Sequence, residues 1–369
     1  MNIIAINSTR IWGGAEVWFS EFCPGMAERG HDLTLVCHPD SELRRRLSEE
    51  PRIQLAPIAI RAELNYLRAV QLARWFRALQ PDVVLAHRPK DVKLSAAALW
   101  LAAPTPLVHA KLYGEPLKDR LDYRMVWQKS VSAMAVPSYE SLERLKEGAP
   151  WLGRMPVTVI PNGVDTDRFR PLPEERERMR RELDIPAEVF VVCYHGRLAA
   201  PKRADLVIRA VAAASADVPA QGLIIGDGPE GPSLQKLAHE LDAQVSFTGH
   251  RDAIPELLAA ADAEITMSEI EGAPLAVIEA MACGLPVIAS QATSHPEVVA
   301  DGESGILVEP GQPKGVAQAI VDLTRNPARR AELGAAARVR AVEHFSADAM
   351  LDRYESFLEE IVLQRPPRA

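Results

Sequence analysis

Short runs of β-branched and other apolar residues alternate along the whole chain with stretches in which apolar residues recur at helical spacing. This alternation predicts parallel β-sheets that carry helices on both faces. The expected strands of the first half are Ile3–Asn7, Leu33–Cys37, Val83–His87, Leu107–Ala110, Ser132–Pro137 and Val157–Ile160. Those of the second half are Val189–His195, Gly222–Gly226, Val245–Thr248, Ala263–Met267, Pro286–Ser290 and Gly305–Val308. The pattern therefore predicts two doubly wound α/β halves.

Breaks in this pattern suggest how the chain is divided. With 369 residues it is too long for one ordinary core. We expect a first domain over 1–160, a linker over 161–186, a second domain over 187–345 and a terminal amphipathic helix over 346–369. Within the linker, residues 171–181 are rich in Pro, Glu and Arg and predict a solvated connector. Pro24-Gly25 predicts a kink or break in the first helix.

Composition narrows the class of protein. Apolar residues make up 47% and charged residues 25%, which is typical of a soluble globular enzyme. We expect no secretory signal and no membrane span, since the most apolar stretch, 94–108, is short and contains two prolines. The four cysteines form no C-x-x-C pair and predict reduced thiols.

Charge is distributed unevenly. Residues 1–160 hold 21 Lys+Arg and 17 Asp+Glu, a net charge of +4. Residues 161–369 carry a net charge of −12, and the two values sum to the total of −8. The basic half predicts contact with an anionic partner such as a lipid phosphate or membrane surface, and ordinary surface variation remains open as the alternative. In the segment 111–129, Tyr113, Leu117 and Leu121 would align on one face of a helix, with Arg120 and Arg124 beside it.

The most informative segment is SEIEGAPLAVIEAMACGLPVIAS, in which seven residues separate Glu271 from Glu279. Pro274 suits the first position of a helix that Gly284 would end. The free N–H groups of that helix start suit a diphosphate, and the two carboxylates offer acceptors to a hydroxyl-rich ligand. The segment predicts a site for a nucleotide-linked sugar.

A second candidate site element is His195-Gly196-Arg197-Leu198, which ends the first strand of the second half. Arg197 and Lys202 would enter from one strand-to-helix loop. Two fixed cations are what a departing nucleoside diphosphate requires, because negative charge grows on it as its bond breaks. A surface ion-pair role is the alternative.

Other motifs are weaker. Gly13-Gly14 opens the first helix and would let an anion approach its backbone, or would simply form a tight turn. Residues 226–231 match G-x-G-x-x-G, but the next strand ends without the acid that binds ribose in nicotinamide enzymes. His109 precedes a long connection and is a candidate for contact with the sugar. Asp165-Thr166-Asp167 matches D-x-D only in spelling, so we expect no metal site.

Taken together, the GGAE turn, IPNGVD, GRL…K, GDGPE, FTGH and EGAPLAVIEAMACGLPV resemble family 4 of the retaining glycosyltransferases over essentially the whole chain. The resemblance implies the GT-B fold, in which two Rossmann-like domains face each other across a cleft and the C-terminal helix crosses back to the first domain. It implies a nucleotide-sugar donor bound by the second domain and an acceptor bound by the first, without a catalytic metal or cofactor. The glycine usual after the loop lysine is Arg203 here.

Carried over by position, the resemblance implies these roles. Arg197 and Lys202 would bind the diphosphate, Glu279 the ribose hydroxyls and Glu271 the donor sugar. His109 would contact the sugar, and Gly14 would lie under the phosphates. His250 and Arg251 would lie near the base, and the donor would also be contacted around the start of the helix by Gly272, Ala273, Pro274 and Leu275.

We therefore expect a retaining hexosyltransferase that uses a nucleotide sugar, with UDP favoured as the nucleotide. The expected acceptor is a glycan or lipid-linked saccharide of cell-envelope polysaccharide or lipopolysaccharide synthesis, and no nucleic acid is expected as a partner. The expected location is cytoplasmic, peripheral at the inner face of the plasma membrane if the basic half meets lipid. A nucleotide-sugar epimerase of the same fold and a non-catalytic nucleotide-sugar-binding protein remain alternatives.

Overall fold

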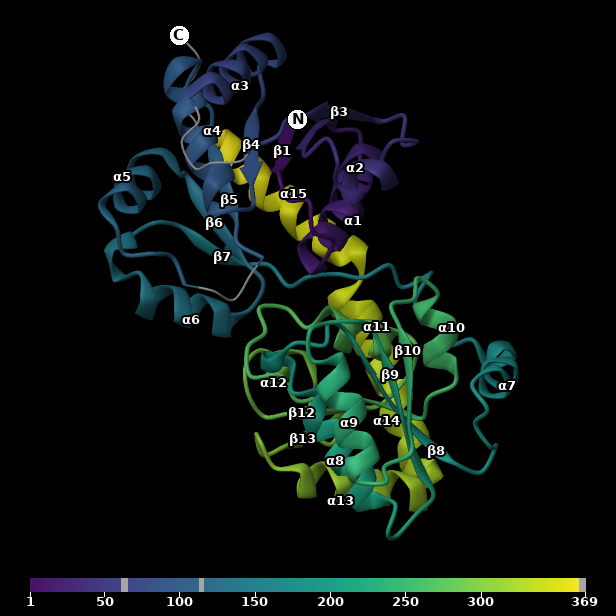
Figure 1. Cartoon of the computed structure of the whole chain (residues 1–369). Helices are drawn as coiled ribbons and strands as arrows, with labels where there is room; N and C mark the ends of the chain where they lie inside the picture. Colours follow the sequence, from purple (N-terminus) through teal and green to yellow (C-terminus); the bar gives the residue numbers. More distant parts are fainter. Residues whose placement is uncertain (61–65, 113–115, 365–369) are drawn as a thin grey trace. The chain divides into compact units, whose positions relative to one another are not determined.

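The computed structural model describes residues 1–60, 66–112 and 116–364. It contains two compact units (Figure 1). The first unit combines Met1–Gly163 with Ala347–Ala369, and the second is Val164–Ser346. The chain thus leaves the first unit after Gly163 and returns to it for its last helix.

The first unit is built on a seven-stranded parallel sheet of order β3-β2-β1-β4-β5-β6-β7. Neighbouring residues of β1, an interior strand of this sheet, point to opposite faces: Ile3 and Ala5 join one apolar core, and Ile4 and Ile6 join the other. Burial on both faces explains the uninterrupted apolar run of this strand. The strands are β1 (Asn2–Asn7), β2 (Asp32–Cys37), β3 (Ile53–Pro57), β4 (Val83–Ala86), β5 (Leu107–Ala110), β6 (Ala133–Val136) and β7 (Val157–Val159).

Helices cover both faces of this sheet. They are α1 (Gly14–Glu28), α2 (Glu42–Arg46), α3 (Tyr66–Leu79), α4 (Pro89–Leu101), α5 (Leu121–Ser130), α6 (Tyr139–Gly148) and α15 (Ala347–Leu363), with a 3₁₀ turn at Pro150–Leu152. The prediction of a break at Pro24-Gly25 is wrong, because α1 continues through both residues. Gly25 has a packing reason: a Cβ there would lie 2.3 Å from Leu351 Cδ1 of α15. Trp18 of α1 also packs against Tyr354 of α15, with ring centroids 5.0 Å apart.

The second unit contains a six-stranded parallel sheet of order β10-β9-β8-β11-β12-β13. The strand order reverses between β8 and β11, so the carboxyl ends of these two strands mark the switch point where such sheets bind ligands. The strands are β8 (Phe190–His195), β9 (Ala220–Ile225), β10 (Val245–Gly249), β11 (Ala263–Thr266), β12 (Val287–Ser290) and β13 (Gly305–Val308).

The helices of this unit also lie on both faces of the sheet. One core includes Val192 and Tyr194 of β8, and the other includes Val191 and Cys193. The helices are α7 (Pro173–Glu182), α8 (Ala204–Ala214), α9 (Gly231–Glu240), α10 (Ile254–Ala259), α11 (Leu275–Ala282), α12 (His295–Val298), α13 (Pro313–Arg325) and α14 (Pro327–Phe345), with a 3₁₀ turn at Ala200–Lys202.

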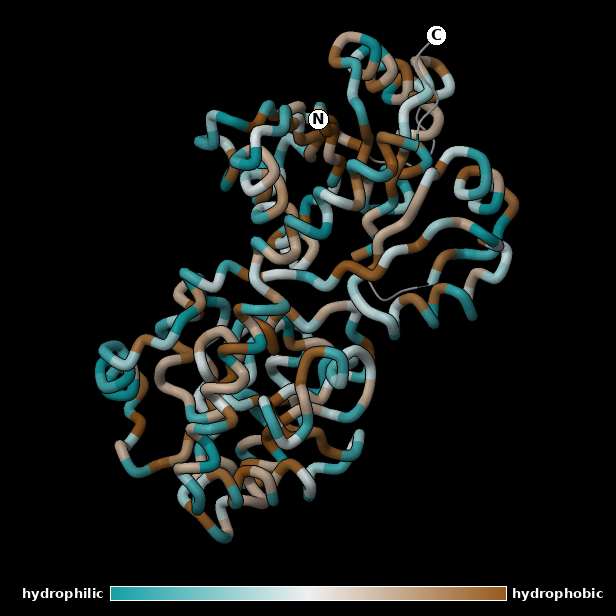
Figure 2. The backbone as a smooth tube through the Cα atoms, turned by 180° about the vertical axis from the view of Figure 1, so that it is seen from behind, coloured by the Kyte–Doolittle hydropathy of each residue, from teal (hydrophilic) through white to brown (hydrophobic). Residues whose placement is uncertain are grey.

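The solvated connector predicted over 171–181 is instead helix α7, which belongs to the second unit. Figure 2 shows α7 as hydrophilic along nearly all its length. It is nevertheless anchored, since Met179 and Arg180 are both about 5% exposed. A composition rich in charge concealed a helix that binds the unit through arginines.

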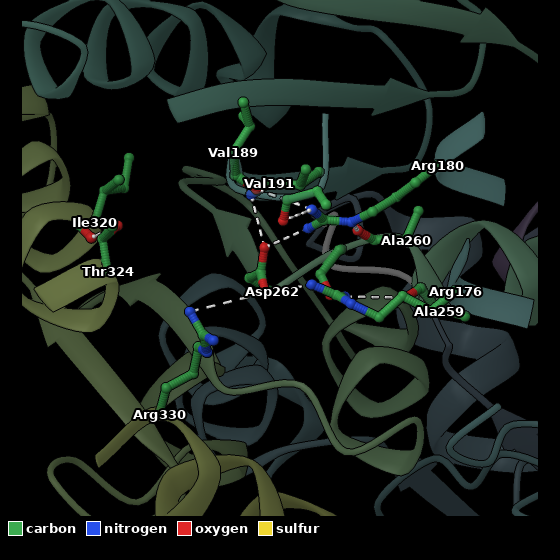
Figure 3. A network of polar contacts seen from close by, with 12 residues as sticks. Arg176, Arg180, Val189, Val191, Ala259, Ala260, Asp262, Ile320, Thr324 and Arg330 are labelled. Carbon is green, nitrogen blue, oxygen red and sulfur yellow. Dashed lines mark hydrogen bonds and ion pairs between the residues drawn. The ribbon is translucent and has the colours of Figure 1, made fainter. Parts of the chain in front are cut away.

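The anchor is the carboxylate of Asp262, which lies just before β11 and is 7% exposed (Figure 3). Its oxygens lie 2.7 Å from guanidinium nitrogens of both Arg176 and Arg180, and its Oδ2 accepts a hydrogen bond from the backbone N–H of Val191. Arg330 approaches the same carboxylate to 3.8 Å. Arg180 also donates to several backbone carbonyls, so its buried charge is fully compensated.

Asp262→Ala should lower the free energy of unfolding by about 3–5 kcal/mol, because it leaves the buried Arg180 guanidinium without its counter-charge. Urea denaturation of the purified chain measures the loss. Glu240→Ala is the matched control, since it removes an exposed ion pair with Lys236 and should cost less than about 1 kcal/mol. Equal, small effects in the two variants would contradict a structural role for the Asp262 cluster.

Candidate nucleotide-sugar site

Two strand-to-helix loops cross closely at the carboxyl edge of the second unit's sheet. A Cβ on Gly226, whose φ is +132°, would lie 2.0 Å from the carbonyl oxygen of Gly196. A Cβ on Gly228 would lie 2.1 Å from the carbonyl oxygen of Leu198. The backbone N–H of Leu198 donates to the carbonyl of Asp227, 2.9 Å away. The glycines of 226–231 therefore allow one loop to support the other, which gives this motif a role without a dinucleotide.

The supported loop carries the two predicted cations. Arg197 is exposed, and its guanidinium has no hydrogen-bond or ion-pair partner among the described residues. Lys202, which ends the 3₁₀ turn at Ala200–Lys202, donates from Nζ to Glu271 Oε1 across 2.5 Å. The structure therefore brings together Lys202 and Glu271, which are 69 positions apart in the sequence.

Arg203 replaces the glycine that the resemblance leads one to expect after the lysine. Its backbone has φ 51° and ψ 39°, a left-handed conformation that costs a non-glycine residue about 1–2 kcal/mol. Its guanidinium compensates by binding Asp205 through two contacts and Glu269 through one of 2.5 Å. The loop thus keeps a glycine-like backbone with an arginine in place.

Helix α11 (Leu275–Ala282) carries Glu279, the second of the two predicted site carboxylates. The helix is one residue shorter at each end than the predicted range from Pro274 to Cys283. Pro274 is therefore its N-cap, not its first residue, and Cys283 is its C-cap. The predicted stop at Gly284 is confirmed: this residue has φ +77° and donates to the carbonyl of Met281, while Leu285 donates to Ala280, the Schellman pattern. Gly272 and Pro274 are buried, and Ala273 and Leu275 are half-buried at the helix start.

Glu279 lies on α11 with its side chain 15% exposed. Its Oε2 lies 2.9 Å from His195 Nε2, and the other ring nitrogen of His195 lies 3.1 Å from Glu264 Oε1. Burial alone lowers the pKa of His195, but the charge of Glu264 and hydrogen bonds to Cys193, Glu264 and Glu279 raise it well above its usual value. Burial raises the pKa of Glu264, opposed by His195. The three side chains form a chain of polar contacts from the sheet to α11.

His250 and Arg251 follow β10 and are both exposed. The backbone N–H of His250 donates to Asp227 Oδ2 across 2.9 Å. Asp227 thus connects the end of β10 with the loop that supports Arg197. Their predicted place near the base remains a prediction, although they follow a strand of the same carboxyl edge.

In the first unit, Gly13 is the N-cap of α1 and Gly14 its first residue. Glu16 lies in the first turn, is 4% exposed and accepts a hydrogen bond from Asn7 Nδ2 at the end of β1. Burial raises the pKa of Glu16, and the hydrogen bond from Asn7 opposes this shift. The predicted contact of Gly14 with phosphates remains a prediction.

His109 lies in β5 with no exposed surface. Its Nδ1 accepts a hydrogen bond from Trp127 Nε1, so its Nε2 carries the proton and donates to the carbonyl of His87. Burial and the charge of Lys111 lower its pKa well below the usual value, which keeps the ring neutral. In this arrangement both nitrogens have protein partners, so contact with a sugar would require them to exchange.

Asp165 has a local structural role. Its Oδ1 accepts hydrogen bonds from the backbone N–H groups of Asp167 and Arg168, both at 2.9 Å. Across the described ranges, one group of three residues has metal-ligand spacing, namely Cys193, His195 and Glu264, whose ligand atoms all lie within 4.8 Å of one another. Sequence reasoning missed this group, because its members come together only when β8 pairs with β11.

His295 is a second residue that sequence reasoning missed. It begins α12, is fully buried, and its Nδ1 contacts the hydroxyl and carbonyl of Ser290. Its Nε2 has no partner within the described part of the chain. Burial lowers its pKa, with Glu271 acting in the opposite direction and Lys202 adding to the decrease. The charges of Lys202 and Glu271 therefore both affect the pKa of His295.

The helix predicted from Tyr113 through Leu121 is wrong where it can be judged. Helix α5 begins only at Leu121, Leu117 is buried outside it, and Tyr113 lies outside the described residues. Arg120 pairs with Asp122, and Arg124 pairs with Asp119. These cations are largely neutralised locally. None of the described helices is both long and apolar enough to cross a bilayer.

Comparison with known families agrees with this geometry. Residues 175–340 match the family described as glycosyl transferases group 1, and residues 12–168 match glycosyltransferase family 4. The two matched regions lie almost entirely in different units of the structure.

Known relatives and structures extend the match. The chain is 32% identical, over 77% of its length and 75% of the relative, to a GDP-mannose-dependent monoacylated alpha-(1-6)-phosphatidylinositol monomannoside mannosyltransferase of Corynebacterium glutamicum. It is 27% identical to the lipopolysaccharide core biosynthesis glycosyltransferase LpsE of Rhizobium meliloti, over 94% of this chain and 96% of that protein. Two further curated relatives are matched over only about half of their length.

Among solved structures, Anabaena Alr3699/HepE in complex with UDP and glucose superposes with a TM-score of 0.84 at 22% identity, over 98% of this chain and 100% of the other. This likeness establishes the fold. Together with the family matches and the mannosyltransferase relative, it shows that the chain belongs to the group 1, family 4 glycosyltransferases of the GT-B fold.

Proposed function

We propose that this glycosyltransferase moves a sugar from a nucleotide diphosphate sugar with retention of the anomeric configuration and without a metal ion. The observation that carries the proposal is the ion pair that Lys202 forms with Glu271 at the switch point of the sheet, on the loop that also holds the unpartnered Arg197. A cation for the diphosphate and an acceptor for sugar hydroxyls then lie side by side. UDP is the proposed nucleotide of the donor, with GDP as the competing choice because the mannosyltransferase relative is described as GDP-mannose-dependent.

The proposed chemistry is a front-face displacement. The bond between the anomeric carbon and the diphosphate oxygen breaks, and the acceptor oxygen bonds to the same face of that carbon. The acceptor proton passes to the departing phosphate oxygen. Arg197 and Lys202 would stabilise the charge that grows on this oxygen. Such electrostatic stabilisation is usually the largest single contribution to catalysis.

For the acceptor we propose a glycan or a lipid-linked saccharide of envelope polysaccharide or lipopolysaccharide synthesis. The relatives support this choice, since one is described as acting on a phosphatidylinositol mannoside and another as making lipopolysaccharide core. Contact with an anionic membrane surface on the cytoplasmic side also stays a proposal. Its support is narrower than the sequence indicated: it is the exposed Leu121 and Met125, one turn apart on α5, with Lys118 and Lys129 nearby in the chain.

The function is tested first by a donor screen in the presence of EDTA. The preferred nucleotide sugar should raise the melting temperature in proportion to the logarithm of its concentration over its affinity. Release of its nucleoside diphosphate should persist in EDTA, because the described residues offer no exposed carboxylate or histidine cluster for a catalytic metal. Loss of turnover that Mg²⁺ or Mn²⁺ restores would contradict metal independence, and binding without turnover for every donor and acceptor would favour a non-catalytic protein.

Arg197→Ala and Lys202→Ala should each lower turnover on the order of 10²–10³-fold, as expected for loss of one group that stabilises developing negative charge. Steady-state release of the nucleoside diphosphate measures the effect. Lys236→Ala is the control for loss of positive charge from the same unit, since Lys236 is exposed on α9. Unchanged turnover in both site variants, with intact folding, would disprove their role.

Glu271 and Glu279 should separate binding of the nucleotide from transfer of the sugar. Glu279→Ala should raise the Kd of the free nucleoside diphosphate about tenfold, which is ~1.4 kcal/mol. Glu271→Gln should bind that diphosphate at least as tightly as the unaltered chain, because Lys202 is released from its ion pair. Transfer should nevertheless fall about 10²-fold as the sugar loses its acceptor. Titration calorimetry with UDP and GDP decides, and equal losses of affinity in both variants would contradict the division of roles.

A further inference from the structure

A histidine and a carboxylate stand behind Glu279 and face it from the sheet. His195 is the last residue of β8, and Glu264 lies on the neighbouring strand β11, where it pairs in register with Cys193. Successive residues of a strand point to opposite faces, so Cys193 and His195 share one face with Glu264. This is the face that α11 covers. A titratable group thus lies in a largely apolar core directly under the predicted ribose-binding carboxylate.

The contacts define a directed chain. Glu264 Oε1 lies 3.1 Å from His195 Nδ1 and also accepts from the His195 backbone N–H across 3.2 Å. His195 Nε2 lies 2.9 Å from Glu279 Oε2. The side chains of His195 and Glu264 are 5% and 1% exposed, whereas that of Glu279 is 15% exposed. Of these three side chains, Glu279 is the most exposed to solvent and is the one that a ligand can contact.

We infer that His195 is a positioning residue for the nucleotide: Glu264 holds it as an imidazolium, and its Nε2–H fixes the carboxylate of Glu279. When both flanking carboxylates are ionised, both ring nitrogens must donate, which only the protonated ring can do. With Oε2 held, Glu279 Oε1 has no hydrogen-bond partner among the described residues and is left to accept from ribose hydroxyls. The inference rests on the proposed role of Glu279 in nucleotide binding.

Other groups near the His195 ring do not provide the positive charge that the two carboxylates need. Burial raises the pKa of Cys193 far above its usual value, and burial raises that of Cys283 at the end of α11 to about 12, so both thiols stay neutral. Burial likewise raises the pKa of Tyr194 on β8. Arg338 of α14 lies near Cys283 and donates to the carbonyls of Phe169, Ala282 and Thr166.

The arrangement predicts how affinity depends on pH. The pKa of His195 is raised, so the fixed geometry of Glu279 is fully present at low and neutral pH and is lost as pH rises through that raised value. Loss of the imidazolium would also leave two buried or half-buried carboxylates close together without a counter-charge. Nucleotide affinity should therefore decline at alkaline pH.

The test uses titration calorimetry with UDP, GDP and their 2′,3′-dideoxy analogues on the full chain. His195→Leu should raise the Kd of the preferred ribonucleotide about tenfold and that of its dideoxy analogue less than twofold, since the analogue lacks the hydroxyls that Glu279 would bind. His195→Gln should restore most of the affinity, because its amide can donate to Glu279, but should abolish the alkaline decline. Val192→Ala, a change at a similarly buried position on the opposite face of β8, should leave both Kd values unchanged.

Equal losses for ribonucleotide and dideoxy analogue would overturn the inference, because they would indicate a general structural defect. A ligand-free readout keeps it independent of the proposed function: ¹⁵N-histidine NMR should show the His195 ring, assigned by His195→Gln, still protonated on both nitrogens at pH 7.5. A neutral ring would overturn the inference. So would stoichiometric zinc in the purified chain that Cys193→Ala removes, since His195 would then be a metal ligand. If the chain binds neither nucleotide, the proposed function fails, and the NMR signature alone decides the state of His195.

Discussion

The candidate site depends on the contact between two backbones. Carbonyl oxygens of Gly196 and Leu198 occupy the space where side chains of residues 226 and 228 would lie, and hydrogen bonds between the loops fix that approach. Any side chain at Gly226 or Gly228 would push the loop after β8 away from the sheet. That loop carries Arg197 and Lys202, so their position relative to Glu271 and Glu279 follows from the absence of two Cβ atoms. The glycines serve the site without having to touch a ligand.

The second consequence concerns charge. Residues 161–369 carry a net charge of −12, yet the proposed ligand is an anion. The structure resolves this by pairing acids locally: Lys202 with Glu271, and His195 with Glu264 and Glu279. Because opposite charges at such distances neutralise each other, only Arg197 presents an uncompensated cation among these residues. A diphosphate that binds Lys202 as proposed would compete with Glu271, so separating that pair would reduce its net binding free energy. The released Glu271 would then be available to a sugar.

Local patterns predicted most of this fold, and long-range pairing explains what they missed. All twelve expected strands are present, because short apolar or alternating runs between helical stretches mark each of them. Strand β3 escaped prediction since it lies at the sheet edge and carries the exposed Gln54 and Pro57. Helix α7 read as a connector because its anchors are arginines whose partner, Asp262, is 82 residues away from Arg180.

The site divides in the same way. The carboxylates and the loop cations were visible as motifs, whereas the neighbours of His195 were not. Their proximity requires the register of β8 with β11 and the placement of α11 over that face. His109 shows the opposite failure, because its position at a strand end suggested exposure while its side chain points into the core between β4 and α5. Spacing along the chain gives the strand but not which face a single side chain occupies.

Asp262 and Glu264 make the final contrast, since they lie two residues apart and point to the same face of the sheet. Asp262 faces Arg176 and Arg180, whose guanidinium groups stay charged at any physiological pH, so this buried carboxylate is permanently compensated and serves only stability. Glu264 lies one step nearer the carboxyl edge and faces an imidazole, whose charge depends on its surroundings. The same physical requirement, a counter-charge for a buried acid, therefore produces an anchor at one position. Two residues further along it produces a group that can respond to pH beneath the site. The amino end of β11 and the strand itself thus differ in the partner that they supply for a buried charge.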